Sequence, residues 1–550
     1  MKLWKAALAV MALLITTGGS AQTDNRFEVS RQLDIFNAMV KELELFYVDT
    51  LNVEQTVRRG VDAMLEGLDP YTEYIPEQEI DALRLLTTGE YAGVGAYIMR
   101  RPEGVTITEL FENMPAMTGG LRAGDVFLQI DNTDVRNESS ERVSEMLKGT
   151  PNSKLKVQVQ RPGDKKPLTV ELTRKQVVVN QVVYYGVRSN NVGYIYLRGF
   201  TDRSAAEVKA ALEDLRRNHN ISSLILDLRN NGGGILESAI QIVNMFVPKG
   251  REVVSTKGKA SQWDRIYRTS IEPVDTLMPL AVMINGQSAS SAEIVAGALQ
   301  DLDRAVLVGQ RSFGKGLVQA PRELPYNGNL KVTISKYYIP SGRCIQQIDY
   351  SHRNPDGSAR HIPDSLTSVF YTVNGRPVRD GGGITPDFAV DEPRPSALIY
   401  YLMQEPDILF DFVTNYVLKH PTIAPAETFS VTDDDLAALK AYAAERNFSY
   451  NRQSSKMFAS LKEMARFEGY LSDADTTALR ELEAHLTPNL DKDFARFGTE
   501  IKQLLSAEIV KRYYYERGEL VRNLQNDPVL AKAVEVLSAP QLVASTLRPQ

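Results

Sequence analysis

Two short segments carry a serine and a lysine that could act together in catalysis. The first is S-A-S-S-A-E-I (288–294), in which Ser290 stands between small residues, and the second is S-F-G-K-G-L-V-Q (312–319), in which glycines flank Lys315. A serine hydroxyl becomes a strong nucleophile only when a base takes its proton, and a neutral lysine can replace the usual histidine. None of the five histidines lies in a glycine-rich or serine-rich turn. The pattern therefore predicts a hydrolase with a Ser–Lys pair.

The serine segment follows a continuous apolar run, L-A-V-M-I (280–284), and precedes an apolar helical run. A serine at such a strand-to-helix turn can hold its hydroxyl outward beside the helix N-terminus, where backbone N–H groups attract negative charge. The N–H of Ser291 is then one predicted oxyanion donor. The alternative interpretation is that Ser288, Ser290 and Ser291 only cap the helix.

Lys315 can act as a base only if its pKa falls far below about 10.4, and burial among apolar side chains is one cause of such a fall. Phe313, Leu317 and Val318 are expected to provide that environment. Gln319, four residues after Lys315, could orient the amine without competing for the proton. Alternatively, Lys315 is an exposed loop lysine and Gln319 is a solvated polar residue.

A glycine run, D-L-R-N-N-G-G-G (227–234), also follows an apolar run and precedes a predicted helix. Its backbone N–H groups could bind an anion. We expect Gly233 or Gly234 to be the second oxyanion donor, because turns that follow parallel strands lie at the same edge of a sheet. A phosphate-binding loop is disfavoured because the pattern G-x-x-x-x-G-K-[ST] is absent from this run. A simple tight turn is the remaining alternative.

A second glycine-rich loop, Y-A-G-V-G-A (91–96), precedes a β-rich region. The backbone of Gly93, Val94, Gly95 and Ala96 could hold a peptide carboxylate while the peptide adds to the sheet as a strand. The alternative is an ordinary turn, because a single G-x-G occurs in many loops.

Residues 1–21 have the pattern of a secretory signal: Lys2 and Lys5, then an apolar run, then the small residues G-S-A. A periplasmic or secreted protein is therefore predicted, and a retained membrane anchor is the alternative. Removing these residues changes the formal net charge from −6 to −8, which argues against a nucleic-acid partner. The only cysteine, Cys344, excludes an intramolecular disulfide and a cysteine-cluster metal site. In Y-Y-I-P-S-G-R-C-I-Q it is expected on a strand–turn–strand, as a small buried residue.

The 550 residues are too many for one core. After the signal at 1–21, apolar residues at helical spacing predict an N-terminal helical region at 22–85. Short β-rich runs separated by turns predict a PDZ-like domain at 86–176. Alternating strands and helices predict an α/β catalytic domain at 177–395, and helical spacing returns in a C-terminal region at 396–550.

Together these segments resemble the carboxy-terminal processing proteases, also called tail-specific proteases, over about residues 30–390. Five signatures match in order: L-D-P-Y-T (68–72); Y-A-G-V-G (91–95) with M-P-A-M-T-G-G-L-R-A-G-D (114–125); the glycine run; the serine and lysine segments; and Y-Y-I-P-S-G-R-C-I-Q (337–346) with G-I-T-P-D (383–387). The family places the nucleophile on the serine before A-S-E. This chain has S-A-E there, so Ser290 is the matching position, and its 25-residue interval to Lys315 favours it over Ser288 and Ser291.

The resemblance implies a multidomain α/β and α+β protein. Its catalytic core is like that of Clp protease and crotonase, with an inserted PDZ-like domain, N-terminal helices and a C-terminal helical extension. It also implies a serine endopeptidase that captures and cleaves protein or peptide substrates at free C-terminal tails, with no metal or nucleotide cofactor. We expect the C-terminal region either to assemble the chain into a homo-oligomer or to restrict access.

Two alternatives remain. The first is a catalytically silent PDZ scaffold that binds C-termini. The second is an acyl-transfer or isomerase relative of crotonase, which is disfavoured because a PDZ-like domain captures peptides.

Overall fold

The computed structural model describes residues 20–80, 87–259, 261–392, 395–404, 406–448, 450, 453–471 and 476–548. Residues 1–19, most of the predicted signal segment, lie outside the described part of the chain. The chain divides into two compact units, one of residues 1–80 with 319–334 and one of residues 81–318 with 335–550. None of the described helices is long and apolar enough to cross a membrane.

The first unit contains the N-terminal helices α2 (Ser20–Phe46) and α3 (Val53–Glu66). α3 begins where Asn52 accepts the N–H of Gln55 at 2.9 Å, and it stops at Gly67, as the sequence predicts. Beyond it, the prediction that helices continue to residue 85 is wrong, because β1 (Glu73–Ile75) pairs antiparallel with residues 329–331. The L-D-P-Y-T turn redirects the chain, since Asp69 accepts the N–H groups of Tyr71 and Thr72 at 2.8 Å each.

In the second unit, the PDZ domain is an antiparallel sheet with two short helices. Its sheet runs in the order β3-β4-β5-β7-β8, β6 pairs with β5, and β2 pairs with β9. Its short strands are separated by turns, as the sequence predicts. The elements are β2 (Glu90–Gly93), β3 (Ala96–Arg101), β4 (Gly104–Leu110), α5 (Pro115–Thr118), β5 (Val126–Ile130), β6 (Thr133–Asp134), α6 (Ser140–Leu147), β7 (Lys154–Gln160), β8 (Leu168–Thr173) and β9 (Lys175–Val178).

The catalytic domain is built on a six-stranded sheet in the order β10-β11-β12-β15-β16-β23. Only β10 is antiparallel to its neighbour; the other strands pair in parallel. Strands and helices alternate along this layer, as the sequence predicts. The elements are β10 (Val182–Arg188), β11 (Val192–Leu197), α7 (Ser204–Asn218), β12 (Ser223–Asp227), α8 (Leu236–Asn244), β15 (Leu280–Ile284), α9 (Ser291–Asp301), β16 (Val306–Gly309) and β23 (Phe388–Ala389).

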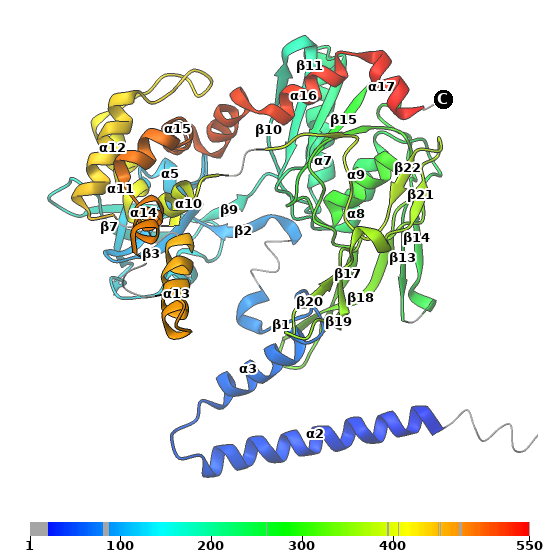
Figure 1. Ribbon diagram of the computed structural model, residues 1–550, viewed down its shortest axis with the longest axis horizontal. Coiled ribbons are helices and arrows are strands. Elements are labelled where there is room, and N and C mark those ends of the chain that lie inside the picture. Colours follow the sequence, from blue (N-terminus) through cyan, green and yellow to red (C-terminus); the bar gives the residue numbers. More distant parts are fainter. Residues whose placement is uncertain are drawn as a thin grey trace, which may run out of the picture. The chain divides into compact units, whose positions relative to one another are not determined.

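Both faces of this sheet are buried. Successive side chains of a strand point to opposite faces, so neighbouring residues belong to different cores. Leu226 and Val282 pack on the face covered by α7, α8 and α9. Ile225 and Met283 pack on the opposite face against residues of the last two helices, α16 (Pro528–Leu537) and α17 (Pro540–Leu547). Figure 1 shows these two helices beside the sheet at the C-terminal end of the chain. The end of the C-terminal region is therefore a layer of the catalytic core.

The rest of the catalytic domain is mainly strands, where the sequence had predicted continued alternation with helices. Cys344 is half-buried, and burial raises the pKa of its thiol. The predicted strand after its turn begins only at Ile348. These elements are β13 (Glu252–Gly258), β14 (Arg265–Arg268), β17 (Leu317–Glu323), β18 (Asn329–Tyr338), β19 (Ile348–Arg353), β20 (Ala359–His361), β21 (Val369–Tyr371) and β22 (Pro377–Arg379).

The other C-terminal helices form their own apolar core, in which Phe494 is buried and Phe497 packs at its margin. The longest, α15, is interrupted at Tyr515, whose φ of 57° and ψ of −167° are not helical. The helices are α10 (Ala397–Gln404), α11 (Pro406–Lys419), α12 (Asp433–Glu445), α13 (Gln453–Phe467), α14 (Thr476–Leu486) and α15 (Leu490–Asn523).

Candidate active site

Ser290 lies at the turn between β15 and α9, with φ 56° and ψ −116°. A non-glycine residue rarely adopts positive φ, and such strain persists where the surrounding structure enforces it. The same geometry holds a serine outward at a sharp strand-to-helix turn in other hydrolases. The neighbouring hydroxyls are used for structure, because Ser288 donates to the carbonyl of Leu228 at 2.7 Å and Ser291 to that of Gly234 at 2.8 Å.

The glycine run lies directly against this serine turn. β12 and β15 are adjacent parallel strands, so the turns that follow them meet at one sheet edge, as the sequence predicts. At Gly233, which has φ 97°, an added Cβ would lie 2.8 Å from the Cβ of Ser290 and 3.0 Å from the N of Ser291. Only glycine fits there. The N–H of Gly233 donates to the side chain of the fully buried Asn231 at 2.9 Å.

The buried carboxylate of Glu293 joins the serine turn to the lysine loop. Its Oε2 accepts the backbone N–H of Ser290 and that of Lys315, each at 2.9 Å. Its Oε1 accepts the hydroxyl of Ser312 at 2.5 Å and the N–H of Gly314 at 2.7 Å. The backbone nitrogens of residues 290 and 315 are therefore no farther apart than two hydrogen-bond lengths.

Burial raises the pKa of Glu293 to about 7, against the opposing effect of these four hydrogen bonds. Burying an ionised carboxylate away from water costs free energy unless hydrogen bonds or opposite charges stabilise it. The ionised form accepts all four donors, whereas a protonated carboxyl would turn one oxygen into a donor. The link between the two loops therefore depends on the ionised state of Glu293.

The surroundings of Lys315 agree only partly with the sequence expectation. Leu317 is buried and Val318 packs against the catalytic core. Phe313 is 40% exposed, so its predicted part in burying Lys315 stays a prediction. Gln319 belongs to the other compact unit, where its amide donates to the hydroxyl of Thr333 at 3.1 Å. Its predicted action on Lys315 therefore stays a prediction.

The predicted tail-binding loop connects β2 to β3. Val94 is buried in the PDZ core, and Gly95, at φ 76°, passes so close to Met114 that an added Cβ would lie 2.3 Å from that side chain's Cβ. Burial raises the pKa of Tyr91 to about 12, and the backbone N–H groups of Gly95 and Ala96 oppose that rise. The donors predicted to hold a carboxylate thus have a phenol in their neighbourhood.

Comparison with known proteins identifies the family. A model of peptidase family S41 matches residues 191–356, a PDZ domain model matches residues 83–172, and a model described as "Probable PDZ-protease, C-terminal helical domain" matches residues 398–537. The chain is 30% identical to the carboxy-terminal-processing protease of Bartonella bacilliformis, over 71% of this chain and 82% of that protein. The chain belongs to the carboxy-terminal-processing proteases of peptidase family S41.

Two further relatives are similar. The chloroplastic C-terminal processing peptidase of Tetradesmus obliquus is 31% identical, over 52% of this chain and 64% of that protein. A solved photosystem II D1 C-terminal processing protease is 28% identical, covers 66% of this chain and 88% of its own, and has a TM-score of 0.34. The chain is therefore a serine peptidase with a PDZ domain, N-terminal helices and a C-terminal helical domain.

In this S41 peptidase, an ion-pair network supports the start of the glycine run. Arg229 bonds Asp227 at 2.7 Å, Glu392 at 3.1 Å and Asp527 at 2.5 Å. Asp527 also caps α16, because its Oδ1 accepts the N–H of Val529 and the N–H of Leu530. The C-terminal region is thus tied by charge to the segment that leads into Gly233.

Sequence analysis of this peptidase missed several residues that shape the site. The role of Glu293 was not predicted, although a glutamate three residues after a helix cap is a known capping signal. Asn231 and Tyr91 stand inside quoted motifs without an assigned role. The ion pair of Asp527 with Arg229 has no local signal, because the two residues are 298 positions apart.

Proposed function

We propose that this peptidase is an endopeptidase with Ser290 as the nucleophile and Lys315 as the general base. The observation that carries the proposal is the shared carboxylate oxygen of Glu293, which bonds the backbone N–H of both residues at 2.9 Å. A nucleophile and its base must be held within hydrogen-bond reach for proton transfer. Anchoring both backbones to one buried carboxylate supports such an arrangement.

In the proposed reaction, neutral Lys315 takes the hydroxyl proton of Ser290 as the serine oxygen attacks the peptide carbonyl carbon. The carbonyl oxygen becomes an oxyanion. When the C–N bond breaks, the lysine ammonium returns its proton to the departing amine, and an ester to Ser290 remains. Water then attacks the ester carbonyl carbon while Lys315 accepts one of its protons. When the ester C–O bond breaks, the lysine ammonium returns that proton to the oxygen of Ser290, and the carboxylic acid product leaves.

The oxyanion donors that we propose are the N–H of Ser291 and that of Gly233 or Gly234. The Gly233 N–H already donates to the side chain of Asn231. We therefore favour Gly234 as the second oxyanion donor. The close approach of Gly233 to the N of Ser291 supports a shared anion site. Donors fixed before reaction stabilise the developing charge without reorganisation.

We also propose that the PDZ domain captures free C-terminal tails through the backbone of Gly93, Val94, Gly95 and Ala96. The loop leads directly into β3, to which a bound tail would add as a strand. Calorimetry with a peptide acid and its amide tests the idea: the amide should bind at least tenfold more weakly. Equal affinities would refute capture by this loop.

Location and assembly are proposals that rest on sequence. Residues 1–21 lead us to propose export to the periplasm or beyond, which N-terminal sequencing of the exported protein would test by a start at residue 22. Self-association through residues 396–550 is the second proposal. Phe494 is buried within that region's own core, so a partner would have to contact other side chains. Light scattering of the full chain tests this proposal, and the mass of a monomer would refute it.

The catalytic proposal is tested by mass spectrometry of products from a protein substrate. Ser290→Ala and Lys315→Ala should each lose activity by a factor on the order of a million, while retaining the circular dichroism spectrum of the wild type. A covalent serine probe should label Ser290 alone. Tail binding without turnover or labelling in the wild type would instead identify a silent PDZ scaffold, and substantial activity of Lys315→Ala would exclude the Ser–Lys pair.

A further inference from the structure

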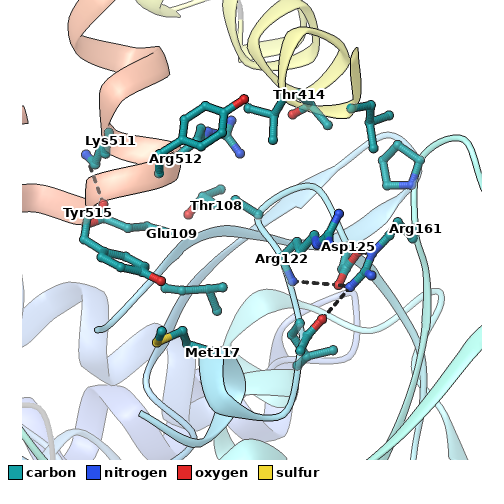
Figure 2. Close-up of a pocket in the computed structure, with 18 of the residues that line it drawn as sticks. Thr108, Glu109, Met117, Arg122, Asp125, Arg161, Thr414, Lys511, Arg512 and Tyr515 are labelled. Atoms are coloured by element: carbon teal, nitrogen blue, oxygen red, sulfur yellow. Dashed lines mark hydrogen bonds and ion pairs between the residues drawn. The ribbon is translucent and has the colours of Figure 1, made fainter. Parts of the chain in front are cut away.

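A cavity of about 580 Å³ lies between the PDZ domain and the C-terminal helices. Figure 2 shows residues of the helices, among them Thr414, Lys511 and Arg512, on one side and PDZ residues such as Met117 and Arg122 on the other. The cavity does not include any residue of the loop Gly93–Ala96. Its size suits a small ligand, and its lining does not include Ser290 or Lys315.

Most of the charged groups around the cavity already have partners. Arg161 pairs with Asp125 at 2.8 Å. Lys511 pairs with Glu109 at 3.0 Å and with Glu519 at 3.2 Å. These pairs neutralise each other within the wall, so they do not need a ligand.

Arg512 is different. Its guanidinium stacks on the ring of Phe410, 4.2 Å from the ring centroid, but among the described residues it forms no hydrogen bond or ion pair. The carboxylates of Glu508, Glu109 and Asp411 attract the Arg512 guanidinium electrostatically without pairing with it. The like charge of Arg101 repels it; Arg101 stacks on the same Phe410 ring, 4.5 Å from the ring centroid. Burial lowers the pKa of Arg512 to about 10. The Arg512 side chain is only partly buried, so its guanidinium donors remain accessible to an anion that enters the cavity.

Apolar side chains form part of the cavity wall. Leu110, Met117 and Leu121 come from the PDZ domain, and Val417 and Leu418 come from α11. A guanidinium fork matches a planar carboxylate through two parallel hydrogen bonds. Its combination with an apolar chamber favours an amphiphilic monoanion over a small hydrophilic one such as phosphate.

We propose that this cavity binds a carboxylate carried on a short apolar chain, with Arg512 as its counter-ion. The ligand would contact both the PDZ domain and α11, and would therefore favour the arrangement in which they are packed together. That arrangement is already held by the Lys511–Glu109 pair and by an ion pair of 2.6 Å between Arg101 and Asp411. Either a fatty acid or the end of an apolar peptide has the required chemistry.

The test is binding to the full chain carrying Ser290→Ala, so that no substrate is consumed and the result does not depend on the catalytic proposal. Calorimetry would use decanoate and an N-acetylated Leu-Leu-Ala acid as probes, with decanol, the peptide amide and inorganic phosphate as comparisons. Binding of decanoate alone would identify an acyl-chain ligand, and binding of the peptide acid alone would identify a peptide tail. In either case, Arg512→Gln should raise Kd at least tenfold.

Arg496→Gln is the matched control. Arg496 lies on the same helix and stacks on Phe497 at 5.3 Å, but it does not line the cavity. It should leave Kd unchanged, whereas Arg512→Lys should be intermediate because it keeps the charge without the fork. Thermal melts of all three variants check folding. The proposal is wrong if neither acid binds, if decanol or the amide binds equally, if phosphate alone binds, or if Arg512→Gln binds like Arg496→Gln, which would assign the binding to another site such as the Gly93–Ala96 loop.

Discussion

The Oε2 atom of Glu293 accepts the backbone N–H of Lys315 at 2.9 Å, so the residue three positions after the proposed nucleophile holds the proposed base. Replacing this carboxylate by an amide places an N–H₂ group among four donors. We expect Glu293→Gln to lower kcat by about a hundredfold, with a smaller effect on KM, because it displaces the two loops and does not touch the substrate. Steady-state kinetics on a peptide substrate measures the split. An unchanged kcat would show that Glu293 does not position the pair.

The same carboxyl should make stability depend on pH. Its pKa of about 7 in the folded protein exceeds its ordinary value of 4.5, so the folded state binds the proton more tightly than the unfolded state. The contribution is then fully present below pH 4.5 and is lost as the pH rises through 7, by about 3 kcal/mol.

The measurement is urea unfolding of the wild type and of Glu293→Gln at pH 4.5 and pH 8. The variant cannot titrate at this position, so its free energy of unfolding should fall less over this range. Identical pH dependence in the two proteins would contradict the raised pKa. Activity should change in the opposite direction, rising with pH, because both ionised Glu293 and neutral Lys315 favour catalysis.

The contact between Gly233 and Ser290 predicts a sharp difference between neighbouring glycines. At Gly233 an added Cβ meets Ser290 at 2.8 Å, whereas at Gly232 nothing lies within 4 Å. Gly233→Ala should therefore lower kcat by a hundredfold or more, and Gly232→Ala should change it less than threefold. Peptidase assays on the two purified variants decide. Equal effects would mean that the glycine run does not approach the nucleophile as described.

The N–H groups of Gly95 and Ala96 act on the phenol of Tyr91, opposing the rise in its pKa. Tyr91→Phe removes the phenol oxygen and keeps the ring, so the two donors should become more available to a carboxylate. We expect the Kd of a tail peptide acid to fall about threefold to tenfold, while that of the peptide amide stays the same. Fluorescence polarisation with both peptides is sufficient. Weaker binding of the acid would instead make Tyr91 part of the carboxylate site.

Local patterns predicted the central layer of the catalytic domain well. Val282 and its neighbours form a continuous apolar run that reads as a buried strand, and the turns after such strands meet for topological reasons. The same reasoning failed where long-range pairing decides. β1 is a strand because residues 329–331 supply its partner, more than 250 positions away. Its three residues alone have no strand signal.

The last helices show the same limit on a larger scale. Residues 396–550 read as one helical region, yet α16 covers a face of the catalytic sheet that its own sequence could not identify. A fully apolar strand such as β15 indicates that both faces are covered, but not by which segment.

This placement carries the final prediction, which concerns Asp527. Its ion pair with Arg229 at 2.5 Å ties α16 to the segment leading into the glycine run. Asn keeps the helix cap but removes the charge, so Asp527→Asn should stay folded while Arg229 loses one of its three carboxylates. We expect kcat to fall about tenfold at unchanged KM, because the loop that carries the proposed glycine oxyanion donor is less well held.

Glu535→Gln is the control for this change. It removes the ion pair of 2.8 Å between Glu535 and Lys532 within α16, and Glu535 does not pair with Arg229. It should leave kcat unchanged. The discriminating measurement is kcat for both variants, with thermal melts to confirm folding. If Asp527→Asn matches the wild type, the C-terminal helix contributes to the sheet's core without supporting the catalytic loop. If Arg229→Lys reproduces the loss in kcat, the effect passes through the guanidinium, because lysine cannot bridge three carboxylates in the same geometry.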